Sequence, residues 1–389
     1  MKKWVVLFAG IILQTILGGI YAWSAFVPSL TENYGFSKGQ CGLVFGVMIA
    51  VFSVSTIPAG YFLNKFGPRI TSLIGSIFFA LGYILASFAG NSFFLIIISL
   101  GIIAGIGVGF GYVCPMSTGM KWFPKNRGLI TGIAVAGFGG GAIILNYVVE
   151  YFVFNMNLVI GDVFLIIGIY FGLAAVISSL FLAEPLNHGY YVEKNNKISI
   201  KEHVFSKSFF TIILGMFAGT FSGLLIIGNL KPMMLSLGVG EFFATLSISI
   251  FSLGNITGRI LWGKIYDRFK SAKTIKLSLI SIFLTFVFFT LKLQVEFLII
   301  VIFFAGMGFG GCFVVYASSV VEKFGMKLFS FLYPICFLSY GLAALIGPST
   351  AGYLKDMSGS YSYAINVCIA MLFIVLIINY ITEKRIKKV

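Results

Sequence analysis

The residue best suited to chemistry is Arg259, which stands within the apolar segment NITGRILWGKIYDRF (255–269). No acidic residue lies within a helical turn of it. If this segment crosses a membrane, the charge costs about 3 kcal/mol on insertion scales, so it must face a bundle interior or a hydrated cavity. A carboxylate ligand would supply the missing counter-ion through a bidentate ion pair. The alternative is a structural arginine that donates to backbone carbonyls at a helix break.

Aromatic side chains are the second group of candidate ligand contacts. A tyrosine offers an apolar face and one hydroxyl, which suits a small organic anion. The alternative for each ring is ordinary packing or lipid contact, because Phe, Trp and Tyr make up 17% of the chain. Asn255, one turn before Arg259, can orient the guanidinium but cannot titrate. The candidates in the apolar segments expected to surround Arg259 are Phe138, Phe313, Tyr316 and Tyr340.

The elements that must hold these residues are transmembrane helices. The chain has 389 residues, of which 59% are hydrophobic and only 10% are charged, whereas soluble domains have about 25% charged residues. Apolar runs of about 18 residues or more predict an all-α polytopic membrane protein with twelve spans. The expected spans are approximately 4–27, 40–63, 70–89, 93–117, 128–149, 160–183, 208–230, 242–263, 274–291, 297–319, 328–353 and 361–381.

The formal net charge of +15 is interpreted as a topology signal. With the N-terminus in the cytoplasm, all but five of the 27 Lys and Arg residues fall on the cytoplasmic side, as the positive-inside rule describes. This predicts a multi-pass cell-membrane protein with both termini cytoplasmic, lipid contacts and no nucleic-acid partner. The exceptions are Arg259 within the membrane and Lys38, Lys231, Lys292 and Lys355 outside. Lys231 and Lys355 could attract anions, but we interpret them as caps that snorkel to the surface.

The sequence has none of the patterns typical of a metal or cofactor site. Its five cysteines form no C-x-x-C pair and lie in or beside apolar segments, which is typical of small packing residues. The segment GVGFGYV (107–113) lacks the Gly-Lys-Ser/Thr of a P-loop. The expected spans hold no histidine cluster or nucleophile–base pair, which argues against an enzyme. We therefore expect no cofactor and no metal.

The chain repeats itself once. GYFLNKF (60–66) matches GKIYDRF (263–269), GVGFG (107–111) matches GMGFG (306–310), and GGIYAWSAFVP (18–28) matches SGLLIIGNLKP (222–232), each at an offset near 203. The longest polar stretch lies between these copies. The predicted organisation is an N-terminal six-helix bundle (1–183), a cytoplasmic linker (184–207) and a C-terminal six-helix bundle (208–389). Parallel repeats of this kind predict a binding site between the halves near the midplane.

The loop segment GYFLNKFGPRITS (60–72) resembles the cytoplasmic signature of the major facilitator superfamily, G-x-x-x-D-x-x-G-x-[RK]. Its glycines are expected to allow close helix approach and a tight turn. The acidic position is Asn64 in this copy, whereas the second copy keeps Asp267. The resemblance implies a gating motif formed by Gly60, Asn64, Gly67 and Arg69 and, in the second half, by Gly263, Asp267 and Arg268.

Longer blocks resemble the oxalate/formate antiporter family, which belongs to that superfamily and carries small organic anions. They include GGIYAWSAF (18–26), YFLNKFGPR (61–69), KWFPKNRGLITGIAVAGFGGG (121–141) and YGLAALIGP (340–348), and the likeness covers nearly the whole chain. It implies a twelve-helix alternating-access carrier with two pseudo-symmetric bundles, the major facilitator fold. By the same resemblance Arg259 binds the transported anion, and Tyr21 and Tyr112 line its site.

One departure from that family bears on the charge of the substrate. Its oxalate carriers place a lysine in the eleventh span, where this sequence has Tyr340. One fixed cation suits a monocarboxylate such as formate, lactate or pyruvate better than the doubly charged oxalate. We therefore predict a monomeric secondary transporter of a small organic anion, working by antiport or symport. The alternatives are an oxalate or dicarboxylate exchanger, a carrier for an unrelated solute, and a non-transporting membrane sensor on a carrier fold.

Overall fold

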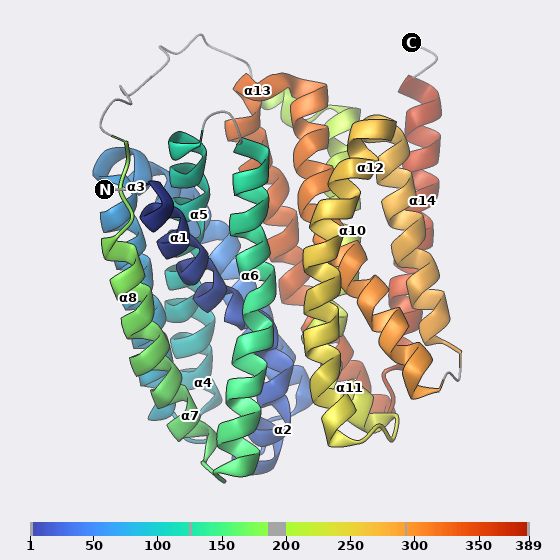
Figure 1. Cartoon of the computed structure of the whole chain (residues 1–389). Helices are drawn as coiled ribbons and strands as arrows, with labels where there is room; N and C mark the ends of the chain where they lie inside the picture. Colours follow the sequence, from blue (N-terminus) through green and yellow to red (C-terminus); the bar gives the residue numbers. More distant parts are fainter. Residues whose placement is uncertain (1–2, 124–126, 186–199, 292–293, 387–389) are drawn as a thin grey trace.

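The computed structural model describes residues 3–123, 127–185, 200–291 and 294–386, and it contains helices and no strand in these ranges (Figure 1). Ten of the described helices are long and apolar enough to cross a membrane. Two of them, of 50 and 49 residues, bend at a non-helical residue: α3 (Lys38–Ser87) at Gly67 and α12 (Glu241–Phe289) at Lys270. Each is long enough to cross twice. They cover the expected span pairs 40–63 with 70–89 and 242–263 with 274–291, except for the last two residues of each pair.

The N-terminal half of the chain is a succession of helices that are repeatedly interrupted within a span. Short 3₁₀ (η1) or π-helical (η2, η3, η4) segments join α-helical ones. Besides α3, its elements are α1 (Lys3–Gly18), η1 (Gly19–Ala22), α2 (Trp23–Tyr34), α4 (Phe93–Ile96), η2 (Ile97–Ala104), α5 (Gly105–Trp122), α6 (Arg127–Glu150), η3 (Tyr151–Asn155), α7 (Ile160–Ile166), η4 (Ile167–Phe171) and α8 (Gly172–Leu180).

The C-terminal half has fewer and longer elements. The middle of the expected linker, residues 186–199, lies outside the described residues, so the division at 183 and 208 stays a prediction. The longest helix, α13 (Val295–Ser358), bends at Gly325, where φ is 80°. Besides α12 and α13, the elements are α9 (Ile200–Val204), α10 (Lys207–Ile227), α11 (Leu230–Ser236) and α14 (Ser362–Ile386).

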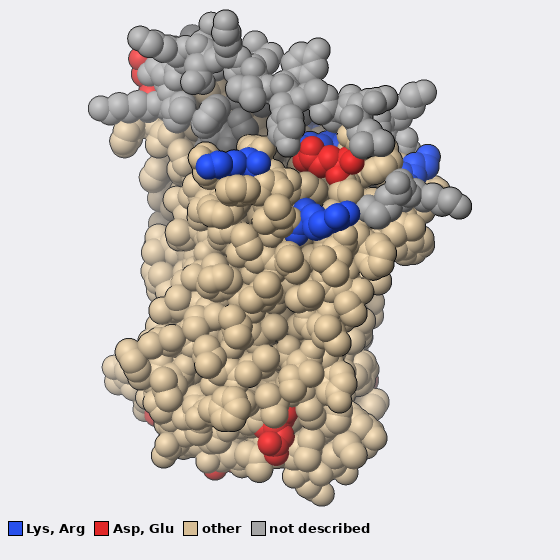
Figure 2. All heavy atoms as spheres, turned by 90° about the vertical axis from the view of Figure 1, so that its left-hand side faces the viewer, with Lys and Arg blue, Asp and Glu red and all other residues tan. Residues whose placement is uncertain are grey.

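The helices stand side by side as one bundle with two distinct ends (Figure 1). The linker end carries the start of α1 and the C-terminal ends of α8 and α14, and the far end carries α2, α7 and α11. On the face shown in Figure 2, charged side chains gather near the two ends, and the broad belt between them is uncharged. An uncharged belt between charged ends matches a protein that spans a bilayer.

Two helices are broken within matching blocks of the repeat, a few residues apart along the block. The first is interrupted by η1, which contains Tyr21, and α10 gives way to α11 at Asn229, where φ is −126° and ψ is 10°. These breaks lie in the matching blocks 18–28 and 222–232. Discontinuous helices of this kind are where transporters place ligand and ion sites.

The two halves are pressed together toward the far end. A Cβ atom added to Gly42 of α3 would lie 2.4 Å from the carbonyl oxygen of Pro348 in α13, and one added to Gly352 would lie 2.2 Å from that of Lys38. The Asp356 carboxylate also accepts the backbone N–H of Gly39 at 2.8 Å. The chain has glycine where the two backbones approach this closely, because a larger side chain would keep the halves apart at this end.

Candidate functional site

Arg259 lies in the first arm of α12 and is 6% exposed. Its Nε donates to Asn255 Oδ1 at 3.0 Å, one turn earlier on the same helix. Its Nη1 donates to the carbonyl oxygen of Val135, on α6 of the opposite half, at 3.2 Å. The predicted orienting contact from Asn255 is therefore present, and the arginine also joins the two halves through a backbone carbonyl.

The surroundings of the guanidinium are aromatic and hydroxylic. The ring of Phe313 lies 4.8 Å from its carbon atom, which is a cation–π distance. The Phe313 ring in turn packs against Tyr340, whose hydroxyl meets that of Tyr21. Neither contact neutralises the charge, so these neighbours lower the cost of burying the arginine without replacing a counter-ion.

No described carboxylate pairs with Arg259. The ion pairs found among the described residues join Lys121 to Glu184 and Lys231 to Glu150 and Glu241. A guanidinium has five N–H donors in a planar fork, and the bonds to Asn255 and Val135 engage only part of them. The site can therefore offer a charged, bidentate-capable donor to an anion.

The predicted tyrosines meet across the boundary between the halves. The hydroxyls of Tyr21, in η1, and Tyr340, in α13, lie 2.8 Å apart. Tyr21 packs edge-on against Phe138 with ring centroids 5.4 Å apart, and Tyr112 does the same at 5.0 Å. Phe313 lies 5.2 Å from Tyr340. Together with Arg259, these five rings form what we call the aromatic cage.

Three further phenylalanines, which the sequence patterns did not single out, complete the cage. Phe52 lies 5.1 Å from Tyr112, Phe309 lies 5.6 Å from Tyr21, and Phe337 lies 5.0 Å from Tyr340. One signal was available, because Phe52 is the repeat equivalent of Asn255 at the offset of 203. The sequence offers no pattern that distinguishes Phe309 and Phe337 from the many other phenylalanines of the chain.

The structure does not bring Tyr316 into this cage. Its ring is completely buried within the C-terminal half, beside Gly215 of α10. A Cβ atom added to Gly215 would lie 2.6 Å from the Tyr316 hydroxyl, so the glycine makes room for this ring. Tyr316 takes part in none of the described ring contacts of the cage.

The residues of the predicted gating motif lie at the linker-end bends of α3 and α12, and their glycines have different surroundings. Gly67 has φ 79° and ψ 173°, so the predicted tight turn requires glycine there. The predicted close helix approach is wrong at Gly60, where an added Cβ would meet no atom within 4 Å. At Gly263, for which no close approach was predicted, the nearest neighbour of an added Cβ would be 3.5 Å away. The remaining members, all exposed, are Asn64, Arg69, Asp267 and Arg268.

Glu322, which the sequence reasoning did not single out, supports the second of these bends. Its carboxylate accepts the Tyr266 hydroxyl at 2.6 Å and the backbone N–H of Ser271 at 3.1 Å. Ser271 follows Lys270, the residue at which α12 bends with φ 61° and ψ −179°. The carboxylate therefore caps the start of the second arm of α12.

Lys231, at the far end, does not snorkel as predicted. Its side chain is completely buried and pairs with Glu150 of α6 and, at 3.1 Å, with Glu241 of α12. The prediction is wrong because two carboxylates meet the ammonium inside the protein. Lys355, in contrast, donates to the carbonyl of Gly359 and caps the C-terminal end of α13 as expected.

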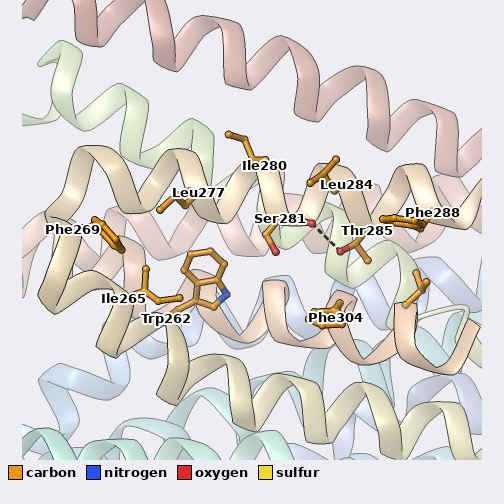
Figure 3. A pocket seen from close by; sticks show the side chains of 11 residues that line it. Trp262, Ile265, Phe269, Leu277, Ile280, Ser281, Leu284, Thr285, Phe288 and Phe304 are labelled. Atoms are coloured by element: carbon orange, nitrogen blue, oxygen red, sulfur yellow. Dashed lines mark hydrogen bonds between the residues drawn. The ribbon is translucent and has the colours of Figure 1, made fainter. Parts of the chain in front are cut away.

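An apolar groove between the two arms of α12 and the start of α13 is unsuited to an anion (Figure 3). Aromatic and aliphatic side chains dominate its lining, and its few polar groups are uncharged. The hydroxyl of Thr285 is turned to the carbonyl of Ser281 at 2.8 Å. The groove is lined by Trp262, Ile265, Phe269, Leu277, Ile280, Ser281, Leu284, Thr285, Phe288, Val301 and Phe304.

Residues 6–335 match the family model of the Major Facilitator Superfamily. The chain is 25% identical to the uncharacterized MFS-type transporter YhjX of Escherichia coli, over 88% of this chain and 86% of that protein. It is 26% identical to the oxalate:formate antiporter of Oxalobacter formigenes, over 70% of this chain and 65% of the antiporter. It is 23% identical to mouse monocarboxylate transporter 2, over 92% of this chain and 79% of that transporter.

A solved structure shares the fold. A bacterial homologue of the human lysosomal transporter Spinster, in an inward-facing and occupied conformation, superposes with a TM-score of 0.74 and 17% identity. The match covers 97% of this chain and 96% of that one. The predicted major facilitator fold is thus confirmed, whereas the expected count of twelve spans stays a prediction.

Proposed function

The chain belongs to the Major Facilitator Superfamily and is a membrane transporter, and on this premise we propose that it carries a small organic anion by alternating access. The favoured substrate is a monocarboxylate such as formate, lactate or pyruvate. The proposal includes a cell-membrane location, cytoplasmic termini, a monomeric state and contact with membrane lipid. Antiport and symport are both compatible with it.

One observation carries the proposal: Arg259 is buried between the halves without a described carboxylate partner. Its neighbours are rings and hydroxyls, which complement the apolar body and the oxygen atoms of a small carboxylate. Relatives named for oxalate, formate and monocarboxylates support the same substrate class.

The contact between Arg259 and Val135 suggests how the anion takes part in the cycle. The guanidinium of α12 donates to a carbonyl of α6, and so holds the two halves together at the site. A bound carboxylate would compete for the same donors and weaken this tie. A ligand shifts a conformational equilibrium only through such a difference in contacts between states.

Tyr340 favours a monocarboxylate over oxalate. At this position its hydroxyl meets that of Tyr21, so two neutral groups stand beside the single cation. A dianion would place its second charge against neutral partners in a poorly solvated site, which is costly. The oxalate exchanger is the second candidate, because the chain resembles an oxalate:formate antiporter.

Transport by purified protein in liposomes tests the proposal. We expect uptake of labelled formate, lactate or pyruvate to exceed that of oxalate and to disappear in Arg259→Gln. Counterflow with and without a pH gradient separates exchange from proton symport. Intact carboxylate flux in Arg259→Gln would contradict the role of the arginine, and oxalate as best substrate would contradict the preference drawn from Tyr340.

A further inference from the structure

Lys231 stands at a helix break with its charge fully inside the protein. It is the second residue of α11, directly after the break at Asn229. The Asn229 amide donates to the carbonyls of Leu225 and Pro348, both at 3.1 Å, which fixes the irregular backbone. A lysine that is 0% exposed needs a partner charge, because an unpaired buried charge is strongly destabilising.

The two carboxylates beside Lys231 are not equivalent. Glu150 ends α6 in the N-terminal half, and its side chain is 19% exposed. Glu241 begins α12 in the same half as Lys231, and its side chain is 54% exposed. When the halves part at the far end, Glu241 stays with the lysine and remains largely in water. Glu150, the better buried partner, leaves with the other half.

A polar face of α12 leads from this cluster toward Arg259. Successive residues of an α-helix are about 100° apart, which places the polar residues within about a third of the circumference. Across the boundary between the halves, α12 lies beside α6, whose Asn146 amide donates to the carbonyl of Thr245 at 2.9 Å. The residues of this face are Glu241, Thr245, Ser249, Ser252, Asn255 and Arg259.

Several polar atoms on this route are buried without a described hydrogen-bond partner. They are the hydroxyls of Thr245 and Ser249 and the amide oxygen of Asn146. Serines in membrane helices commonly bond back to a carbonyl one turn earlier, as Ser252 does to Ile248 at 2.9 Å. Unsatisfied buried polar atoms call for an explanation, and an intermittently hydrated or ligand-lined surface supplies one.

We propose that Lys231 is a second carboxylate-binding position of the transport route, which the Glu150 carboxylate fills while the far end is closed. The inference rests on the proposed function, since it takes the transported solute to be a carboxylate. When the halves part, the solute takes the place of Glu150 beside the lysine. It then passes along the polar face of α12 to Arg259.

The test measures the KM for carboxylate at each membrane face, in intact cells and in inverted vesicles. Lys231→Gln removes the proposed site, and we expect it to raise KM about tenfold at the face that exposes the far end. Glu150→Gln removes the competing carboxylate, and we expect it to lower KM at that face about threefold. Glu241→Gln is the matched control, because it removes a carboxylate from the same lysine without crossing between the halves. Its effect should stay below about twofold.

The opposite directions of the two expected changes in KM distinguish a binding site from an ion pair that only holds the two halves together. If Lys231→Gln and Glu150→Gln change KM in the same direction by similar factors, the pair only holds the far end closed, and the inference is overturned. If Lys231→Gln does not fold, Lys231→Arg should keep a near-normal KM. In that case, an unchanged or raised KM in Glu150→Gln overturns the inference and leaves the proposed function untouched. A wild-type protein without carboxylate flux instead contradicts the proposed function itself.

Discussion

The two halves bend at equivalent positions by different means. Gly67 and Lys270 are 203 residues apart, the offset of the repeated motif, and both have positive φ and extended ψ. The first half uses glycine, which enters this region freely, whereas the second uses a lysine at a cost of about 1–3 kcal/mol. The bond from the Ser271 backbone N–H to the Glu322 carboxylate compensates for this cost. The first half has no such carboxylate, because the repeat equivalent of Glu322 is Phe123. The repeat therefore preserves backbone geometry more strictly than residue identity.

The same comparison at the candidate site separates the roles of the halves. Arg259 and Asn255 have Thr56 and Phe52 as their repeat equivalents. The Thr56 hydroxyl bonds to the Ser53 carbonyl of its own helix at 2.7 Å, and Phe52 packs in the aromatic cage. Both halves thus supply rings, but one supplies the charge and the other supplies a backbone carbonyl. A nearly symmetric frame holds an asymmetric site.

The largest expected effect comes from the charge at these equivalent positions. Arg259→Gln should lower kcat/KM for a monocarboxylate by more than about 100-fold, because it removes the charged partner of the anion. Initial rates in liposomes measure the loss. Thr56→Val is the matched control in the other half and should stay within about twofold. Equal losses in both variants would show that the helix position matters and that the charge does not.

The bend of the first half should be intolerant of a side chain. Gly67→Ala forces a Cβ into the positive-φ region and should destabilise the protein by about 2 kcal/mol, seen as a lower Tm in detergent. Gly60→Ala is the control on the same helix, since its Cβ would meet no atom within 4 Å. It should be neutral or slightly stabilising. A similar loss in Gly60→Ala would refute the assignment of the turn to Gly67.

A second cation in the cage should change selectivity. Tyr340→Lys is expected to raise the ratio of oxalate to formate transport about tenfold, because the second carboxylate would gain a fixed partner. Competition assays in liposomes measure this ratio. Tyr340→Phe removes the hydroxyl contact with Tyr21 without adding charge, and should leave the ratio unchanged. A shift in both variants would assign selectivity to the hydroxyl pair.

The smallest expected effect has the opposite sign to the Gly67 substitution. Lys270→Gly relieves the strained backbone and should raise the stability by about 1 kcal/mol, measured as a higher Tm. The gain should be larger when Glu322→Gln weakens the bond to Ser271, because the strain is then less well compensated. A loss of stability in Lys270→Gly would mean that the lysine side chain outweighs its backbone conformation.

Local patterns predicted the parts of the molecule that depend on nearby residues. Apolar run length located the helices that are long enough to cross a membrane, and the spacing of Asn255 and Arg259 predicted their contact. The Val135 carbonyl could not be foreseen, because it is a backbone atom 124 positions away. Lys231 was misread for a similar reason: its partner Glu150 lies 81 positions away, across the boundary between the halves. Contacts between halves carry no periodicity that a single sequence reveals.

The lone charge of Arg259 has an electrical consequence under the proposed function. Arginine and a monocarboxylate sum to zero, so the loaded site gives the membrane voltage no net charge to act upon. An empty site would carry one positive charge, and a site with a dicarboxylate one negative charge. Moving a unit charge through the membrane potential is worth about 2.3 kcal/mol per 100 mV. The voltage would thus distinguish the empty carrier from the loaded one and a monoanion from a dianion.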